Sequence, residues 1–454
     1  MEENKIFKRK IYDQILAWKN SPIKNSALLI EGARRIGKST IVEEFAKNEF
    51  PGNYLMVDFR KEGEDTKALF DNTKDLDAFF RKFFLTQNRV LKEGGLIIFD
   101  EIQFCPKARQ AIKDFVADGR YRYIETGSLI SIKENTKDIM IPSEERRIDM
   151  YPMDFEEFLW AIEGNDAFPL FGSLLANHET IPSDIHASYM EKLRTYVLIG
   201  GMPKVLSIFL QTNSFQLADE EKSDILKLYR DDLRKHDNKY GTICGSLFDS
   251  IPAQLAKENR RFLINEVENQ KRFTQIKKSL DDLCDFRIVN RVASVSSLEG
   301  PLGLKAEEAL FKLYFCDTGL LMGKLLPLKG EEMNKSYFDF LVHGKCSLNL
   351  GAVFESAAVQ MLTMRGYALY YHRYCLADNE TGKTKNYELD LVLEREMKAS
   401  AIEIKSSKNY TTSSLDRIRE KYPQVKIRHL VCGIKNIRYE GDKTTLPLYL
   451  LPLL

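Results

Sequence analysis

Apolar and polar residues alternate with two different periods along the first third of the chain. Short apolar runs, each typical of a buried strand, occupy residues 27–30, 54–59, 96–100 and 121–128. Between them lie segments with helical spacing, at residues 40–48, 76–91 and 107–116. Strands that alternate with helices in this way predict a parallel sheet with helices on its faces. We therefore expect an α/β domain at the N-terminus.

The middle of the chain, from about residue 206 to 323, has a mainly helical pattern. Before it, residues 154–162 and 188–198 show helical spacing, and Asp154 is placed to cap the first of these helices. Residues 286–295 look like a strand, and a turn follows at 296–301. Helices followed by a small hairpin predict a winged-helix unit. Its basic stretch, residues 271–278, is either a phosphate-contacting surface or a solvated helix face.

A segment with proline, glycine and several charges, residues 325–335, is typical of a linker. Beyond it, a long helix and short strands alternate. The chain of 454 residues is long enough for each part to bury its own core. We expect three domains, at residues 1–205, 206–335 and 336–454.

Composition narrows the picture only slightly. The 44% hydrophobic and 29% charged residues are typical of a soluble globular protein. With 67 basic and 66 acidic residues the net charge is +1, so no overall field indicates a polyanionic partner. The sequence shows neither a membrane-spanning run nor a signal-peptide core, which predicts a cytoplasmic protein. The seven cysteines are scattered without zinc-site or disulfide-framework spacing.

Residues 28–39 combine an apolar strand with the pattern G-x-x-x-x-G-K-S, and a helix-like segment follows. This is a phosphate-binding loop in the context that the motif requires. The glycines let backbone N–H groups surround a phosphate, the lysine adds positive charge, and the serine hydroxyl can hold Mg²⁺. The alternative is an ordinary turn between strand and helix. ATP and Mg²⁺ are the expected ligands, and the expected contact residues are Gly32, Arg35, Gly37, Lys38, Ser39 and Thr40.

The strand at residues 96–100 delivers two adjacent carboxylates, Asp100 and Glu101, where ligands of parallel sheets bind. Asp100 is expected to hold Mg²⁺ and Glu101 to activate water, because phosphoryl transfer depends on positioning and charge neutralisation. A solvated strand end is the alternative. The next strand ends with Thr126 and Ser128, and either hydroxyl could sense the γ-phosphate, although this sequence also suits a simple turn.

Acidic residues suggest a second site in the C-terminal region. Strand alternation places Glu388 and Asp390 on one face, and Glu403 and Lys405 on one face of the next strand. With Glu355 on the preceding helix, these groups could hold Mg²⁺ and orient a water for phosphodiester cleavage. The order of elements is that of restriction-endonuclease-like folds. Alternating strands with a charged outer face would give the same pattern.

Together these features resemble a prokaryotic family of AAA-type P-loop ATPases that carry a C-terminal domain of unknown function. The resemblance runs nearly from end to end and is carried by residues 32–39, 100–103, 125–128, 151–158, 200–203, 314–320 and 354–355. It implies an ATPase core, a winged-helix-like middle and a nuclease-like C-terminal fold. In this setting residues 200–203 are expected to form a structural turn, and Asp317 to be a packing or capping residue.

The family resemblance also implies an arginine after the sensor strand that completes the ATPase site. Arg146 and Arg147 lie in this interval, without the glycine that commonly precedes such an arginine. Arg146 is the candidate arginine finger. A structural salt bridge is the alternative.

The preferred hypothesis is a cytoplasmic, Mg²⁺-dependent ATPase whose nucleotide state is coupled to its C-terminal domains. One alternative is a nucleotide-gated switch that binds DNA or a protein effector and hardly turns over ATP. Another is an ATPase fused to an active metal-dependent nuclease. Each is compatible with a homo-oligomer.

Overall fold

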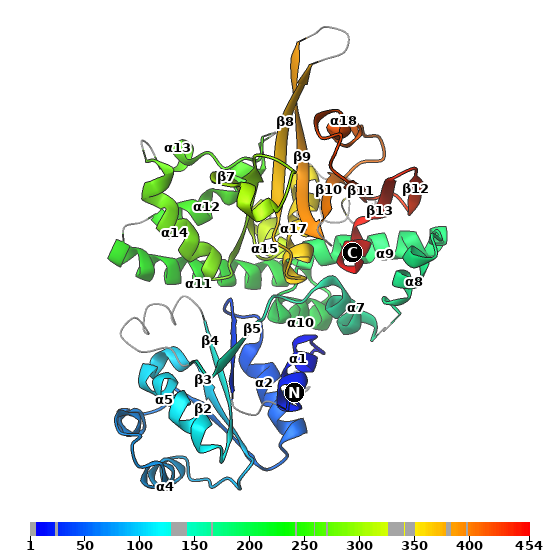
Figure 1. Ribbon diagram of the computed structural model, residues 1–454. Coiled ribbons are helices and arrows are strands. Elements are labelled where there is room, and N and C mark those ends of the chain that lie inside the picture. The colour runs from blue at the N-terminus through cyan, green and yellow to red at the C-terminus, as the bar shows by residue number, and fades with distance from the viewer. Residues whose placement is uncertain are drawn as a thin grey trace. The chain divides into compact units, whose positions relative to one another are not determined.

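The chain forms two compact units (Figure 1). The first comprises residues 1–151 and 285–287, and the second comprises residues 152–284 and 288–454. The computed structural model describes residues 6–22, 26–128, 143–164, 167–240, 243–257, 259–268, 271–325, 340, 350–377, 383–395 and 398–454. Residues 326–335 of the expected linker lie outside these ranges.

The first unit is built on a five-stranded parallel sheet with the order β2-β3-β4-β1-β5. Its strands are β1 (Ala27–Gly32), β2 (Tyr54–Asp58), β3 (Leu96–Asp100), β4 (Arg122–Ser128) and β5 (Glu145–Asp149). Its helices are α1 (Ile11–Lys19), α2 (Lys38–Glu49), α3 (Glu64–Ala68), α4 (Leu76–Thr86) and α5 (Pro106–Asp118). Helices α1 and α2 lie on one face of the sheet, and α4 and α5 lie on the other (Figure 1). The α/β fold expected from the sequence is confirmed.

An aromatic core fixes α4 against the sheet. Phenylalanines fall on one face of this helix at positions 79, 80, 83 and 84. Phe79 packs on Phe115 of α5, and Phe83 packs on Phe99 of β3. Asp75 caps the helix because its side chain accepts a hydrogen bond from the Ala78 N–H at 2.9 Å. The helix ends at Thr86 instead of the expected residue 91, since Asn88 adopts a left-handed conformation with φ 47°.

The second unit has a run of helices before its sheet and further helices between its strands. They are α7 (Phe155–Glu163), α8 (Leu170–Ala176), α9 (Ser183–Ile199), α10 (Pro203–Thr212), α11 (Phe215–Tyr240), α12 (Ile243–Leu255), α13 (Ile264–Val267), α14 (Phe273–Asp285), α15 (Thr318–Leu325), α17 (Leu350–Met364) and α18 (Ser413–Lys421). The expected cap of α7 is confirmed. Asp154 accepts the Glu157 N–H, and the Glu157 side chain in turn accepts the Asp154 N–H, which is a capping box.

A mixed eight-stranded sheet completes the second unit, in the order β12-β13-β11-β10-β9-β8-β6-β7. Strands β8 and β9 form a long antiparallel ribbon (Figure 1). The strands are β6 (Val289–Val295), β7 (Ala306–Phe315), β8 (Tyr370–Ala377), β9 (Thr384–Arg395), β10 (Lys398–Lys405), β11 (Ile427–Gly433), β12 (Arg438–Glu440) and β13 (Lys443–Pro447).

This sheet gives a different division of the chain from the three expected domains. Strands β6 and β7 form the expected antiparallel hairpin, but β6 also pairs in parallel with β8. The hairpin therefore continues the C-terminal sheet and is not a separate wing. The first compact unit ends near residue 151 instead of 205, because α7, α9 and α10 group with the second unit.

The Gly200–Gly201 turn is held by a buried carboxylate. Asp317 accepts hydrogen bonds from the Gly201 N–H at 2.6 Å and from the Leu320 N–H at 3.1 Å. A Cβ on Gly200, whose φ is +82°, would lie 2.2 Å from Asp317 Oδ1. Only glycine fits there. The expectations of a structural turn and a capping aspartate are confirmed.

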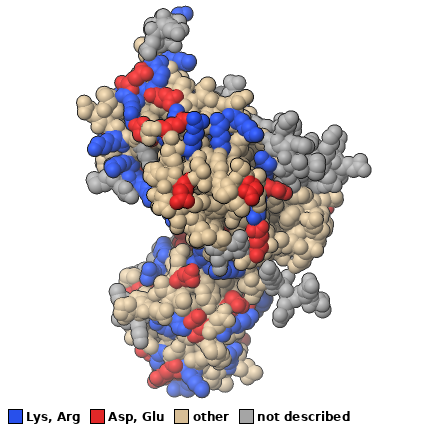
Figure 2. Space-filling model, turned by 90° about the vertical axis from the view of Figure 1, so that its right-hand side faces the viewer, with Lys and Arg blue, Asp and Glu red and all other residues tan. Residues whose placement is uncertain are grey.

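The outer surface of the described residues carries charges of both signs. Figure 2 shows one face, on which lysine and arginine side chains lie among aspartate and glutamate side chains. Among the described residues, no single helix is both long and apolar enough to cross a bilayer; one helix pair, bent by 116°, passes that test on length and composition alone.

Replacing Asp317 should destabilise the second unit. Asp317→Ala leaves two buried N–H groups without acceptors, so we expect a loss of about 2–4 kcal/mol in the free energy of unfolding. Chemical denaturation measures it. The control is Asp224→Ala, at an exposed side chain, which should change the unfolding free energy by less than about 0.5 kcal/mol. Equal free energies of unfolding for the two variants would contradict the stabilising role of Asp317.

Candidate nucleotide site

The phosphate-binding loop joins β1 to α2 and depends on its two glycines. A Cβ on Gly32 would lie 2.3 Å from the Met150 carbonyl oxygen, so no larger residue fits without moving the backbone. Gly37, directly before α2, has a left-handed φ of 93°. Arg35 also has a positive φ, 67°, and is exposed. The strand, turn and helix thus follow one another as the motif requires.

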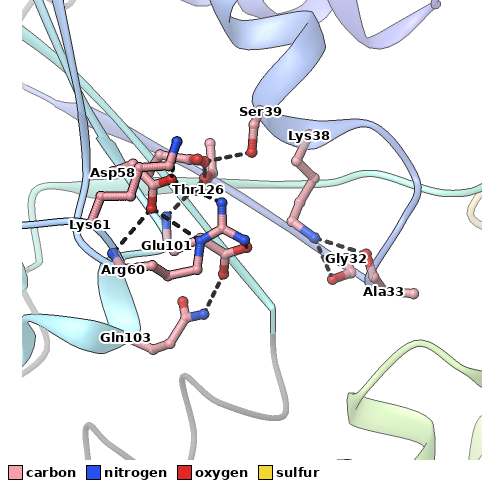
Figure 3. Close-up of polar contacts among 11 residues, drawn as sticks. Gly32, Ala33, Lys38, Ser39, Asp58, Arg60, Lys61, Glu101, Gln103 and Thr126 are labelled. Atoms are coloured by element: carbon pink, nitrogen blue, oxygen red, sulfur yellow. Dashed lines mark hydrogen bonds and ion pairs between the residues drawn. The ribbon is translucent and has the colours of Figure 1, made fainter. Parts of the chain in front are cut away.

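Lys38 is buried within this loop. Its Nζ donates hydrogen bonds to the carbonyl oxygens of Gly32 and Ala33, at 3.0 and 2.8 Å (Figure 3). Burial lowers the pKa of Lys38 to about 8, although the carboxylates of Glu101 and Asp100 act in the opposite direction. Among the described residues, its hydrogen-bond partners are these two neutral carbonyls. A buried ammonium group in such a setting favours binding of an anion.

Asp100, at the end of β3, joins the loop to the sheet. Its Oδ1 accepts hydrogen bonds from the Ser39 hydroxyl at 2.7 Å and from the Thr126 hydroxyl. Burial raises the pKa of Asp100, while these two hydrogen bonds lower it. Ser39 and Asp100 bring together the hard oxygen donors that suit Mg²⁺.

Glu101 follows in a left-handed conformation, with φ 55° and ψ 50°. Its N–H donates to Thr126 Oγ1 at 3.4 Å. Its carboxylate accepts a hydrogen bond from the Gln103 side chain and lies 3.9 Å from Arg60 Nη1 (Figure 3). A non-glycine residue with positive φ is uncommon and is found disproportionately at functional sites. The bend directs Glu101 to the same edge of the sheet as Asp100.

Sequence reasoning missed three side chains that shape this edge. Asp58, at the end of β2, is the register partner of Asp100. It holds Arg60 through two hydrogen bonds, of 3.1 and 2.9 Å, which bring its pKa down to about 2 against the effect of burial. Arg9 supports the loop from the segment before α1, by donating to the Ile36 carbonyl at 2.8 Å. Asp58 had a detectable signal as a third strand-end acid, whereas nothing local marks Arg9.

The remaining expected residues lie at different distances from this centre. Thr40 is exposed in the first turn of α2, and Ser128 is buried opposite Gly32 in the register of β4 and β1. Arg146 is exposed on β5, opposite Leu28, and is therefore several residues away from the strand end where the loop begins. The fold does not bring Arg146 to the phosphate loop of its own chain.

The salt-bridge alternative is realised by the neighbours of Arg146. Arg109 of α5 forms a buried pair with Glu145, with distances of 2.9 and 2.8 Å. Arg147 also donates to Glu145 at 2.8 Å. The Arg109–Glu145 pair ties α5 to the edge strand β5, whereas the Arg147–Glu145 pair lies within β5.

The C-terminal acids come together only in part. Asp390 accepts the Ile404 N–H at 2.8 Å, and Lys405 Nζ lies 2.5 Å from Glu403. Burial and the nearby Asp390 raise the pKa of Glu403 to about 7. Glu355 instead pairs with other cations, Lys312 at 3.0 Å and Arg260.

These acids do not form the expected metal site. Among the described residues, no group of three or more histidine, cysteine, aspartate or glutamate side chains is placed to hold a metal ion. The basic stretch at 271–278 is also partly neutralised. Lys271 pairs with Glu268 at 2.9 Å, and Lys277 pairs with Glu308.

Comparison with known proteins identifies the N-terminal region. An AAA domain matches residues 24–159. Two domains of unknown function, DUF8612 and DUF4143, match residues 190–332 and 350–451. No curated protein matches the chain. With its parallel sheet and phosphate-binding loop, the N-terminal region is of the AAA-type P-loop ATPase class.

Solved structures that are similar to this chain share little sequence with it. PCH-2 of C. elegans is 12% identical with a TM-score of 0.22, over 41% of this chain and 53% of that one. The Hsp104–ADP complex of S. cerevisiae is 13% identical with a TM-score of 0.28, over 62% and 39%. A DNA replication initiation factor is 9% identical with a TM-score of 0.23, over 61% and 77%. The chain thus spans about half of PCH-2 and 39% of Hsp104.

ATP binding should take up protons near pH 8. A bound triphosphate stabilises the charged form of Lys38, so its pKa rises from about 8 and a proton is absorbed from the buffer. Titration calorimetry at pH 8 in two buffers of different ionisation enthalpy measures this uptake. We also expect the affinity for ATP to fall as the pH rises above about 8. An observed enthalpy that is identical in both buffers would contradict this assignment.

The Glu403 carboxyl should destabilise the fold when it ionises. Its folded-state pKa is raised from 4.5 to about 7, so the folded state holds its proton longer than the unfolded state does. Stability is therefore lost as the pH rises through this window. Glu403→Gln should gain stability relative to the wild type between about pH 4.5 and 7, in denaturation experiments. The matched variant Glu191→Gln, at an exposed position, should show no such trend; parallel trends would refute the prediction.

Proposed function

We propose that the chain is a Mg²⁺-dependent ATPase of the AAA type. The observation that carries this proposal is the meeting of three hydroxyl or carboxyl groups from separate elements. Ser39 of α2 and Thr126 of β4 both donate to Asp100 of β3, directly beside Glu101. A helix start, two strand ends and a buried lysine then surround one position at the sheet edge, as phosphoryl transfer requires.

The loop residues account for nucleotide binding. Lys38 exchanges its bonds to the Gly32 and Ala33 carbonyls for phosphate oxygens, and the N–H groups at the start of α2 face the same anion. Ser39 and Asp100 would hold Mg²⁺, which when bound neutralises charge on the phosphates. The hydrogen bond between these two side chains at 2.7 Å supports this fit.

Glu101 is the proposed base. It orients a water molecule and accepts its proton as the water oxygen forms a bond to the γ-phosphorus and the bond to ADP breaks. ADP and phosphate leave, and the proton returns to solvent. Thr126 is a positioning residue, because it contacts both Asp100 and the Glu101 N–H.

The same proposal has four further parts. The nucleotide state is coupled to the second unit, the effector is DNA or a protein, the location is cytoplasmic, and the assembly is a homo-oligomer. The runner-up, a nucleotide-gated switch with negligible turnover, uses the same site and differs only in rate. A steady-state ATPase assay with and without DNA separates the two. The nuclease alternative lacks a supporting metal site among the described residues.

Two substitutions separate binding from hydrolysis. Lys38→Ala removes the buried ammonium group, so we expect loss of ATP binding, measured with a fluorescent ATP analogue. Glu101→Gln keeps shape but not basicity, so it should bind ATP and hydrolyse it about 100-fold or more slowly.

The matched control is Glu64→Gln, on α3, whose side chain is 90% exposed. It should leave both binding and rate unchanged. Unaltered ATP affinity in Lys38→Ala would contradict the assignment of the nucleotide site. An unaltered rate of ATP hydrolysis in Glu101→Gln would contradict the assignment of Glu101 as the base.

A further inference from the structure

The strongest unexplained feature lies in the second unit, around Glu355 of α17. This carboxylate is fully buried, and both of its oxygens are occupied. Oε1 accepts from Lys312 Nζ at 3.0 Å and from the Tyr314 hydroxyl. Oε2 pairs with Arg260. A charged residue buried to this degree persists only when it is paired, as it is here.

Lys312 has a position that is unusual for a lysine. It lies on β7, its side chain is 1% exposed, and its Nζ bridges Glu355 at 3.0 Å and Glu388 at 2.9 Å. The ammonium also lies 5.0 Å from the centre of the Tyr371 ring, which gives a cation–π contact. The Lys312 ammonium thus lies between two carboxylates and an aromatic ring, and it neutralises the carboxylates as a bound metal cation would.

The other acids of the expected metal site are occupied as well. Glu388 also contacts Arg373 at 3.3 Å, Asp390 accepts the Ile404 N–H, and Glu403 pairs with Lys405. Glu403 Oε1 has no hydrogen-bond partner among the described residues. One oxygen without a partner provides no chelating set of carboxylates for a divalent cation such as Mg²⁺, which takes about six oxygen ligands, several of them waters.

We propose that Lys312, with Arg260, takes the place of a divalent cation among these carboxylates, so that the second unit closes this site with its own positive charges. The residues do not fit a metal, because Glu355, Glu388 and Glu403 form ion pairs and Asp390 accepts a backbone N–H. Residues 190–332 supply both cations, whereas residues 350–451 supply the acids. These ion pairs therefore join the two matched regions, consistent with their grouping in one compact unit.

The proposal is tested by creating the metal site. Mn²⁺ binding is measured by calorimetry on the full chain carrying Asp100→Ala, which removes the carboxylate that is proposed to hold Mg²⁺ in the nucleotide site. In this background we expect no site tighter than about 1 mM, the weak end of the range for oxygen-ligand sites. Adding Lys312→Met, of similar length without the charge, should tighten Mn²⁺ binding at least tenfold. Lys312→Arg, which keeps the charge, should not.

A further substitution shows whether any gain in Mn²⁺ affinity arises at Glu355. Combining Lys312→Met with Glu355→Gln should abolish it. A folded Lys312→Met protein without gain, or a gain that survives Glu355→Gln, would overturn the proposal. If Lys312→Met does not fold, Mn²⁺ binding is compared between the Asp100→Ala protein and the same protein carrying Glu355→Gln. Mn²⁺ binding that is lost with Glu355→Gln would show an open metal site and would overturn the proposal. These readouts involve no nucleotide, so failure of ATP hydrolysis leaves them unaffected.

Discussion

The candidate nucleotide site depends on one interaction: Asp100 Oδ1 accepts hydrogen bonds from two hydroxyl groups. Through Ser39 it fixes the start of α2, and through Thr126 it fixes β4, which lies between β3 and β1 in the sheet. The buried environment strengthens these bonds, because water does not compete for the carboxylate. Once they form, the loop, Lys38 and Glu101 have fixed positions at one sheet edge.

The two acidic centres of the chain show opposite solutions to burying charge. In the first unit, Lys38 faces two neutral carbonyls, and Asp100 faces two neutral hydroxyls. Each charge there lacks a direct ionic partner among the contacts described, and it gains most from an incoming ion. In the second unit Glu355 already holds Lys312 and Arg260. The first centre is open to a charged ligand, whereas the second is satisfied by the chain itself.

The features that the sequence could predict are those with local causes. The two glycines, the apolar strand before them and the Asp100–Glu101 pair lie within short segments, and periodicity places them on known elements. The Asp154 cap is local in the same sense. Strand ends of a parallel sheet share an edge, so proximity of the loop and the acids follows from the alternation of strands and helices.

The features that the sequence could not predict depend on pairing between distant segments. Strand β6 joins β8 across about 75 residues of chain, which removes the expected wing. Lys312 reaches Glu355 in the same way, and no local pattern marks that lysine as a counter-ion. The position of Arg146 was not predictable for another reason: the sequence around it does not show that it pairs with Leu28, several residues before the start of the phosphate-binding loop.

The most direct test of the account is a crystal structure with a non-hydrolysable ATP analogue and Mg²⁺. The account predicts that Lys38 Nζ leaves the carbonyls of Gly32 and Ala33 and contacts phosphate oxygens, while Ser39 and Asp100 lie at the metal. Nucleotide bound elsewhere, or Lys38 still bonded to those carbonyls beside a bound triphosphate, would contradict it.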